Sequence, residues 1–214
     1  AQAYSSYRNA TIVMIDALYN HFAYGIEKHP LAIRNFLRYL NTEHQLPEQL
    51  FLVGKSVAID YSRNNTTYNN QNLIPTMGYP PSDMLLASKI EGESIVPSVA
   101  IGRLPALSNQ SVNTYLSKVQ EFESQPPAMW MKNILHFGGG NNQSEQQVFA
   151  GYLRNYANII EDSLMGAHVS TFLKNSSDPI QITASDSIRY LINNGTSLLT
   201  FFGHGYSGGF DQDI

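Results

Sequence analysis

The sequence predicts an α/β fold in which a mostly parallel sheet is flanked by helices and divided between two subdomains. Short apolar segments of strand length recur along the chain, and segments with the 3–4 spacing of an amphipathic helix lie between them. Such alternation indicates βα units built around a parallel sheet. A Pro126-Pro127 pair also separates the chain into two blocks.

Six segments have the length and composition of buried strands, and several of them end in glycine or in polar residues. They are residues 10–15, 50–53, 99–101, 134–137, 169–173 and 197–202. Each is expected to be a strand.

Segments with helical patterns lie between the expected strands. Pro30 opens one, and Ser108 is the expected N-cap of another. The apolar stripes of these two helices are Ala32, Ile33, Phe36, Leu37 and Leu40 in the first, and Val112, Leu116, Val119 and Phe122 in the second. Residues 143–160 and 185–192 supply two more helices. The asparagine-rich residues 62–71 are expected to be a loop, either solvated or functional.

The two prolines end the preceding helix and hold the chain extended, so we place subdomains at residues 1–125 and 126–214. Only 14% of the residues are charged, the net charge is -4, and no run of basic residues occurs, which argues against a nucleic-acid or anionic-membrane partner. No segment approaches the roughly 20 apolar residues of a membrane span.

The chain contains no cysteine, which excludes a disulfide, a thiolate metal site and a cysteine nucleophile within these residues. The histidines other than His204 show no H-x-x-x-H spacing, which argues against a zinc site. His136, inside an apolar segment, is expected to be a hydrogen-bonded core histidine.

His204 is the strongest candidate for chemistry. It follows the apolar segment 197–202 and lies between Gly203 and Gly205. The carboxyl ends of parallel strands are where ligands bind in open α/β sheets. An imidazole there suits general acid–base work, and the backbone N–H of an adjacent glycine can bind an oxyanion. The alternative interpretation is a turn histidine that merely ends a strand.

Two further patterns compete for a role near this position. Residues 205–209 match G-x-S-x-G, which would make Ser207 a serine nucleophile, but Ser207 stands five residues beyond Phe202 and no histidine follows it. The turn at residues 138–142 fails the spacing of nucleotide-binding loops. Gly139, Gly140 and Asn141 are instead candidates for lining a cleft at the edge of the sheet where His204 lies.

Arg103 follows an apolar segment and is expected to pair with an acid such as Asp83 or Asp60. A guanidinium fork paired with a carboxylate commonly fixes local geometry. We therefore expect Asp83 and Arg103 to brace loops rather than contact a substrate.

Several motifs, taken in order, resemble the gingipain family of cysteine peptidases. They include residues 20–25, 29–37, 51–54, 74–76, 82–83, 100–105 and Phe202-Gly203-His204-Gly205. Within that family, residues 130–140 are most similar to the signal peptidases (sortases) of type IX secretion. The resemblance covers nearly the whole chain.

The resemblance implies a caspase-like fold with two subdomains and a Cys-His mechanism. His204 would serve the thiolate and protonate the leaving amine, while the N–H of Gly205 would hold the oxyanion. In the family the nucleophilic cysteine closes the next strand, and a strand precedes the helix expected at residues 1–9. We therefore expect a fragment of a larger protein, inactive by itself. Family members also carry acidic residues after the strand that corresponds to 134–137, and here Glu145 is the nearest acid. The sequence therefore leaves open whether there is a third catalytic residue and whether the peptidase prefers Arg or Lys in its substrate.

The parent protein is thus expected to be a cysteine endopeptidase that processes secreted proteins in type IX secretion, in an extracytoplasmic location: on the cell surface, associated with the outer membrane, or secreted. The alternative from another class is an inactive binding or scaffold domain of the same fold. Expected partners are a protein or peptide substrate and the remainder of the parent polypeptide. The resemblance implies no required cofactor and leaves calcium open as a structural ion.

Overall fold

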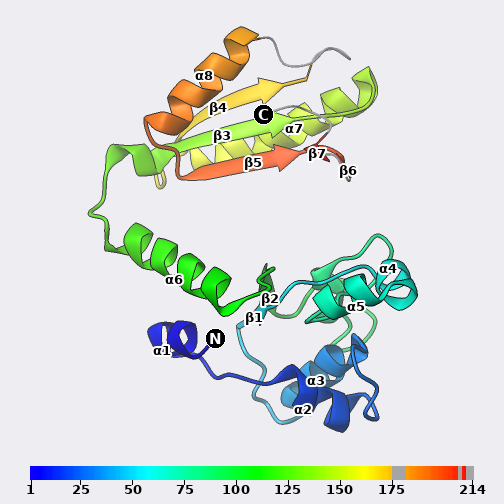
Figure 1. Cartoon of the computed structure of the whole chain (residues 1–214). Coiled ribbons are helices and arrows are strands. Elements are labelled where there is room, and N and C mark those ends of the chain that lie inside the picture. Colours follow the sequence, from blue (N-terminus) through cyan, green and yellow to red (C-terminus); the bar gives the residue numbers. More distant parts are fainter. Residues whose placement is uncertain (175–181, 207–208, 211–214) are drawn as a thin grey trace. The chain divides into compact units, whose positions relative to one another are not determined.

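The computed structural model describes residues 1–174, 182–206 and 209–210 (Figure 1). The chain divides into two compact units, Ala1–Ser124 and Gln125–Ile214. The division lies one residue before the boundary placed from the sequence. Parallel strands flanked by helices occur in both units, so the predicted α/β class is confirmed.

Unit 1 contains a pair of parallel strands, β1 (Gln49–Val53) and β2 (Ala100–Leu104), in register from Gln49 opposite Ala100 to Val53 opposite Leu104. The helices around them are α1 (Gln2–Arg8), α2 (Ile15–Phe22), α3 (Leu31–Thr42), α4 (Ile59–Asn64), α5 (Thr66–Gln71), the 3-10 helix η1 (Asp83–Leu86) and α6 (Asn109–Ser124).

The core of unit 1 forms where the apolar faces of α2 and α3 meet the strands. Its buried members include Leu18, Tyr19, Ala32, Ile33, Leu37, Leu52 and Leu86. A second contact joins α1 to α6 and β1, because the ring of Tyr4 stacks on Phe51 with centroids 4.9 Å apart and lies 5.9 Å from Tyr115. Burial of these apolar faces supplies most of the stabilisation available to such short helices.

The start of α6 agrees with the sequence pattern. Ser108 precedes the helix, and its Oγ accepts a hydrogen bond from the N–H of Ser111 at 3.2 Å, which is an N-cap interaction. Val112 and Leu116 are buried as the stripe predicts, whereas the expected stripe member Phe122 is exposed.

Two element predictions in unit 1 are wrong. Residues 10–15 form no strand: residues 12–14 are exposed, and α2 begins at Ile15 because Ile15, Leu18, Tyr19 and Phe22 have helical spacing that buries Leu18 and Tyr19. Residues 62–71 are not a loop but belong to α4 and α5. Asn65 caps α5, accepting a hydrogen bond from the N–H of Tyr68 at 3.2 Å.

Unit 2 is built on three parallel strands in the order β4-β3-β5. These are β3 (Asn133–Gly138), β4 (His168–Leu173) and β5 (Leu198–Phe202), with α7 (Gln143–Ile160), α8 (Ile182–Asn193), the 3-10 helix η2 (Met129–Lys132) and a short antiparallel pair, β6 (Gly205–Tyr206) and β7 (Gly209–Phe210). The register places Gly138 opposite both Leu173 and Phe202.

The two long helices of unit 2 cover opposite faces of this sheet (Figure 1). Ile188 of α8 packs with Leu135 and Phe137, which point to one face of β3. On the other face, a Cβ on Gly138 would lie 3.1 Å from Leu153 of α7, so the absence of a side chain there permits close packing. Side chains on α7 therefore lie over the face that also carries Phe202.

His136 lies at the centre of β3 and is only 1% exposed. The expectation of a core position is confirmed, but the expectation of full hydrogen bonding is wrong, because Nδ1 has no partner among the described residues. Burial lowers the pKa of His136, against opposing effects of the Leu153 backbone and the Glu161 charge.

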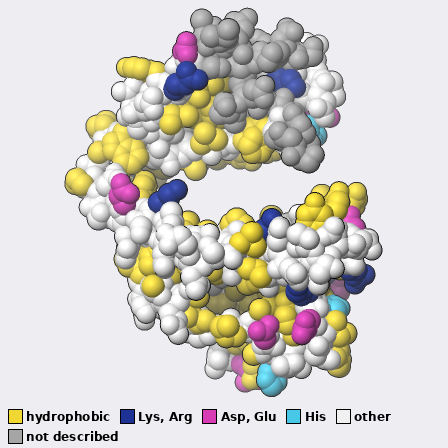
Figure 2. Space-filling model, in the orientation of Figure 1, with side chains coloured by type: hydrophobic (Ala, Val, Ile, Leu, Met, Phe, Trp, Pro, Cys, Tyr) yellow, Lys and Arg dark blue, Asp and Glu magenta, His cyan; other side chains and the backbone are white. Residues whose placement is uncertain are grey.

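Charged side chains are sparse and scattered on the face shown in Figure 2, in keeping with their low number in the sequence. In the described part of the chain, no helix is both long enough and apolar enough to cross a membrane.

Candidate active site

The carboxyl ends of β3 and β5 lie side by side at one edge of the sheet in unit 2. Beyond Gly138 the chain turns into α7, and beyond Phe202 it continues to Gly203 and His204. The N–H of Gly139 donates a hydrogen bond to the carbonyl oxygen of Phe202 at 2.9 Å, which extends the ladder by one residue. The turn after β3 and the segment carrying His204 are therefore held next to each other.

The turn between β3 and α7 has a conformation that suits glycine at residue 140. Gly140 has φ +128°, and an added Cβ would lie 2.8 Å from the N atom of Gln146. The side-chain amide of Gln146 donates a hydrogen bond to the Gly140 carbonyl at 3.2 Å. This close approach fixes the first turn of α7 against the end of β3.

Two asparagines and one glutamate define the start of α7. Asn142 is the N-cap, and its Oδ1 accepts a hydrogen bond from the N–H of Glu145 at 3.0 Å. The Glu145 carboxylate in turn accepts one from the N–H of Asn141 at 2.9 Å. This arrangement resembles a capping box, in which the third residue of a helix reaches back to the chain before it.

The same Glu145 oxygen, Oε2, lies 3.1 Å from Nε2 of His204. Both side chains are partly accessible, at 37% for Glu145 and 47% for His204. The hydrogen bond from Asn141, followed by that of His204, lowers the pKa of Glu145 below its ordinary value. An ionised carboxylate only accepts hydrogen bonds, so Nε2 is the protonated nitrogen in this pair and Nδ1 carries the lone pair in the neutral ring.

One aromatic side chain, Phe149, contacts the His204 ring from α7. The Phe149 ring centroid is 5.7 Å from that of His204 and 5.1 Å from that of Phe202. The site thus combines a carboxylate–imidazole pair with an apolar wall.

Gly205, the predicted oxyanion residue, is in β6 and pairs with Phe210 of β7. No described atom outside its chain neighbours lies within 4 Å of a Cβ built on Gly205, so no described residue crowds this backbone. Ser207, the alternative nucleophile, lies outside the described residues.

The structure therefore brings together His204, Gly139, Gly140 and Asn141, and adds Glu145, which the sequence indicated only as the nearest acid. The two glycines and Asn141 position the start of α7 through their backbones. A glutamate three residues after an asparagine N-cap is the sequence signal that could have placed Glu145 beside the turn.

The other predicted pair, Asp83 and Arg103, lies in unit 1. Nε and Nη2 of Arg103 donate to the two Asp83 oxygens at 2.6 and 2.7 Å, a bidentate geometry. Nη1 donates to the carbonyl oxygens of Gly54 and Ile74 at 2.7 and 2.9 Å. The Arg103 side chain, 9% exposed, thus joins the ends of both strands to the segment at residues 74–83.

Burial by itself would raise the pKa of Asp83, but hydrogen bonds from Arg103 and Thr76 and the Arg103 charge outweigh it, so that pKa lies below its ordinary value. Asp60, the other acid considered as a partner, lies in α4, where its backbone carbonyl accepts a hydrogen bond from the side chain of Asn64.

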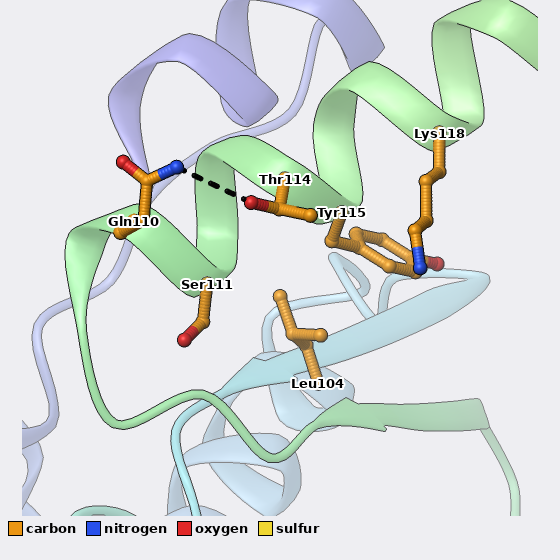
Figure 3. Close-up of a pocket in the computed structure, with 6 residues that line it drawn as sticks. All are labelled: Leu104, Gln110, Ser111, Thr114, Tyr115 and Lys118. Carbon is orange, nitrogen blue, oxygen red and sulfur yellow. Dashed lines mark hydrogen bonds between the residues drawn. The ribbon is translucent and has the colours of Figure 1, made fainter.

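A pocket of about 390 Å³ in unit 1 lies between α6 and the end of β2 (Figure 3). It is lined by Leu104, Gln110, Ser111, Thr114, Tyr115 and Lys118. The Gln110 amide donates to the Thr114 hydroxyl at 3.4 Å within its wall. None of the residues predicted for chemistry lines it.

Among the described residues, no group of three or more His, Asp or Glu side chains is placed to hold a metal ion.

An α/β fold with a carboxylate-paired histidine at the carboxyl edge of a parallel sheet is an arrangement that peptidases of the Cys-His class can use. The family model described as peptidase family C25 matches residues 1–214. The chain therefore belongs to peptidase family C25, the gingipain family of cysteine peptidases. No curated protein and no solved structure matches the chain significantly.

Proposed function

We propose that this chain supplies the catalytic histidine of a cysteine endopeptidase, with His204 as general base and acid and Glu145 as the residue that orients it. The 3.1 Å contact between Glu145 Oε2 and His204 Nε2 carries the proposal. Because the sequence contains no cysteine, the nucleophilic thiol would come from outside these 214 residues. We therefore interpret the chain as a fragment of the active peptidase.

The tautomer of His204 assigns a role to each ring nitrogen. Nε2 donates its hydrogen to the Glu145 carboxylate, so Nδ1 accepts the proton of the thiol. The thiolate then attacks the carbonyl carbon of the scissile peptide, and the resulting oxyanion is bound by the N–H of Gly205. As the intermediate collapses, the imidazolium returns its proton to the departing amine and leaves a thioester, which water hydrolyses.

Two features of the site support this assignment. Among the described residues, none crowds the Gly205 backbone, so none of them hinders the close approach of a substrate carbonyl. The Glu145 carboxylate also stabilises the imidazolium that forms during the reaction, because opposite charges within hydrogen-bond distance favour the charged state. At this degree of exposure, salt screens the charge interaction and geometry contributes more than attraction.

The first test compares variants in the parent polypeptide that carries the thiol. His204→Ala is expected to lower kcat by about 10²- to 10⁴-fold, the usual contribution of a general acid–base residue. Glu145→Gln retains an oxygen to accept from Asn141 but loses the charge, so it lowers kcat by less. Hydrolysis of a peptide substrate and the melting temperature are measured together.

Asp186→Asn is the matched control, because Asp186 is an exposed acid of the same unit that pairs with Arg189 on α8. It is expected to leave kcat unchanged, as is Ser207→Ala. The isolated 214-residue chain is expected to show no turnover. Full activity of His204→Ala, or peptidase activity of the isolated chain, would overturn the proposal, and loss of activity in Ser207→Ala would favour the serine-hydrolase alternative.

The lack of a cysteine favours one second candidate, an inactive binding or scaffold domain of the same fold. A peptide probe that alkylates catalytic thiols distinguishes the two: the parent polypeptide reacts with it in the peptidase case and does not in the scaffold case. The similarity of residues 130–140 to type IX secretion signal peptidases supports a role in processing secreted proteins at the cell surface or outer membrane. If the parent protein has this role, cells carrying His204→Ala are expected to accumulate unprocessed secreted precursors.

A further inference from the structure

The pocket in unit 1 is a candidate binding site that the proposed peptidase function does not use. It has a volume of about 390 Å³ and lies between α6 and the end of β2 (Figure 3). Pockets that bind small molecules have volumes of roughly 300–1,000 Å³ and combine mostly apolar walls with a few polar groups. We call this hollow the α6 pocket; its lining residues are Leu104, Gln110, Ser111, Thr114, Tyr115 and Lys118.

Five of the six lining residues lie along one side of α6. Ser111 and Tyr115 are four residues apart, and Lys118 follows three residues later, so their side chains succeed one another along the helix. Eight residues separate Gln110 from Lys118, which corresponds to about 12 Å along the helix axis. The α6 pocket is therefore elongated, and its two ends carry different chemical groups.

The middle of the α6 pocket is apolar and held in place. The ring of Tyr115 stacks on Phe51 of β1, with centroids 5.9 Å apart and an interplanar angle of 25°, and it lies 5.9 Å from the ring of Tyr4 of α1. The side chain of Leu104, at the end of β2, points toward α6 (Figure 3). Both Tyr115 and Leu104 are partly buried. A wall that is fixed before binding loses little side-chain entropy when a ligand arrives.

One end of the α6 pocket carries a positive charge. Lys118 is exposed, and none of the ion pairs among the described residues includes it. Glu123, an acid further along α6, accepts hydrogen bonds from Tyr7 and Arg8 instead. The Lys118 ammonium group is therefore able to pair with a carboxylate that a ligand brings to this end of the pocket.

The other end of the α6 pocket is polar but uncharged. The hydroxyls of Ser111 and Thr114 and the amide of Gln110 lie there. Nε2 of Gln110 donates to the Thr114 hydroxyl at 3.4 Å, and the Ser111 hydroxyl lies 3.0 Å from that of Ser108. Because a hydroxyl can both donate and accept, this end suits a neutral polar group of a ligand.

We propose that the α6 pocket binds a small carboxylate that has an apolar body and a neutral polar group at its far end. The carboxylate pairs with Lys118, and the body packs against Tyr115 and Leu104. The far end hydrogen-bonds the hydroxyls of Ser111 and Thr114. Charge complementarity selects an anion over the neutral or cationic molecule of the same shape. This binding function is independent of the peptidase proposal, because it uses no residue of the candidate active site.

The test titrates the 214-residue chain with para-hydroxyphenylacetate, with its neutral analogue tyrosol and with its cationic analogue tyramine, and follows the backbone amide signals by NMR. The acid is expected to shift the signals of α6 and the end of β2 saturably. It is expected to bind about 2- to 5-fold more tightly than tyrosol, the range that one exposed ion pair provides. In Lys118→Gln this preference is expected to disappear. Lys89→Gln is the matched control, because it removes a lysine of the same unit that already pairs with Glu93, and it is expected to retain the preference.

A second pair of variants tests the pocket itself. Thr114→Phe adds bulk to the wall of the α6 pocket and is expected to weaken the binding of para-hydroxyphenylacetate. Asn113→Phe adds the same bulk at the neighbouring exposed position, which does not line the pocket, and is expected to leave binding unchanged. Melting temperatures show that each variant is folded. Equal affinities for the three compounds, a preference for the acid that persists in Lys118→Gln, or the absence of saturable shifts in α6 would overturn the proposal, whatever the peptidase activity of the parent polypeptide.

Discussion

Arg103 shows how one side chain can determine the geometry of a strand edge. Its guanidinium hydrogen-bonds Asp83, the carbonyl of Gly54 after β1 and the carbonyl of Ile74, so three separate segments meet on one cation. Buried carbonyl oxygens at strand ends need donors, and five N–H groups in a planar fork can satisfy several of them at once. Lysine, with a compact charge, cannot reproduce this pattern.

Removing this brace is expected to destabilise unit 1. Asp83→Asn leaves Arg103 buried without its counter-charge, and breaking a buried pair in this way costs about 3–5 kcal/mol. Because the pKa of Asp83 is lowered in the folded state, its contribution is present above the unfolded value of about 3.9 and is lost as pH falls through the folded-state value. Urea unfolding from pH 3 to pH 7 measures both effects.

The control for this prediction is Asp186→Asn, whose pair with Arg189 is largely exposed on α8. Exposed pairs contribute about 0–1 kcal/mol, so its unfolding free energy should stay near that of the parent chain. Equal stability of Asp83→Asn and Asp186→Asn would show that the brace has no energetic role.

Strand β3 is the element on which unit 2 depends, because it lies between β4 and β5 and is covered on both faces. A fully buried strand is expected to be apolar throughout, yet His136 occupies its centre with Nδ1 lacking a partner among the described residues. An unsatisfied buried polar atom costs roughly 1–3 kcal/mol. An apolar side chain at residue 136 of β3 should therefore make the fold more stable than histidine does.

We expect His136→Leu to stabilise unit 2 and to remove a pH dependence. Since the folded-state pKa of His136 is lowered, the unfolded chain binds the proton first. Stability is therefore lost as pH falls below the unfolded value of about 6.5, by up to about 1.4 kcal/mol per pH unit until the folded-state pKa is reached. Denaturant unfolding at pH 5, 6 and 7 should show this slope in the parent chain and a shallower one in the variant. An unchanged slope would mean that His136 does not titrate on unfolding.

At the scale of the whole molecule, the parallel strands and long helices could be predicted because each is encoded locally. The helix at residues 143–160 follows Asn142 and has apolar residues at helical spacing, and the strand at 134–137 is a short, mostly apolar segment between Asn133 and Gly138. Residues 10–15 were misassigned because a short apolar run cannot by itself distinguish a strand from the start of a helix. Whether such a segment becomes a strand depends on pairing with a neighbouring strand, and the neighbouring strand lies elsewhere in the sequence.

In the candidate site, too, contacts between residues far apart in the sequence could not be predicted from local patterns. His204 could be recognised from its flanking glycines, since a single motif carries the signal. Its contact with Glu145 could not be predicted, because the two residues are 59 positions apart in the sequence and only the register of β3 with β5 brings them together. Phe149 gave no sequence signal, because an aromatic residue in a helical stripe is most simply a core residue.

The two units have separate cores, which predicts two separable unfolding transitions. Trp130, the sole tryptophan, lies in unit 2 beside Gly195, so its fluorescence reports on that unit, whereas far-ultraviolet circular dichroism reports on both. Asp83→Asn should shift the transition of unit 1 in the dichroism curve and leave the fluorescence midpoint unchanged, whereas His136→Leu should shift the fluorescence midpoint. In the double variant the two shifts should add, because sites without shared partners behave independently. A fluorescence midpoint that moves with Asp83→Asn would show instead that the chain unfolds as one cooperative body.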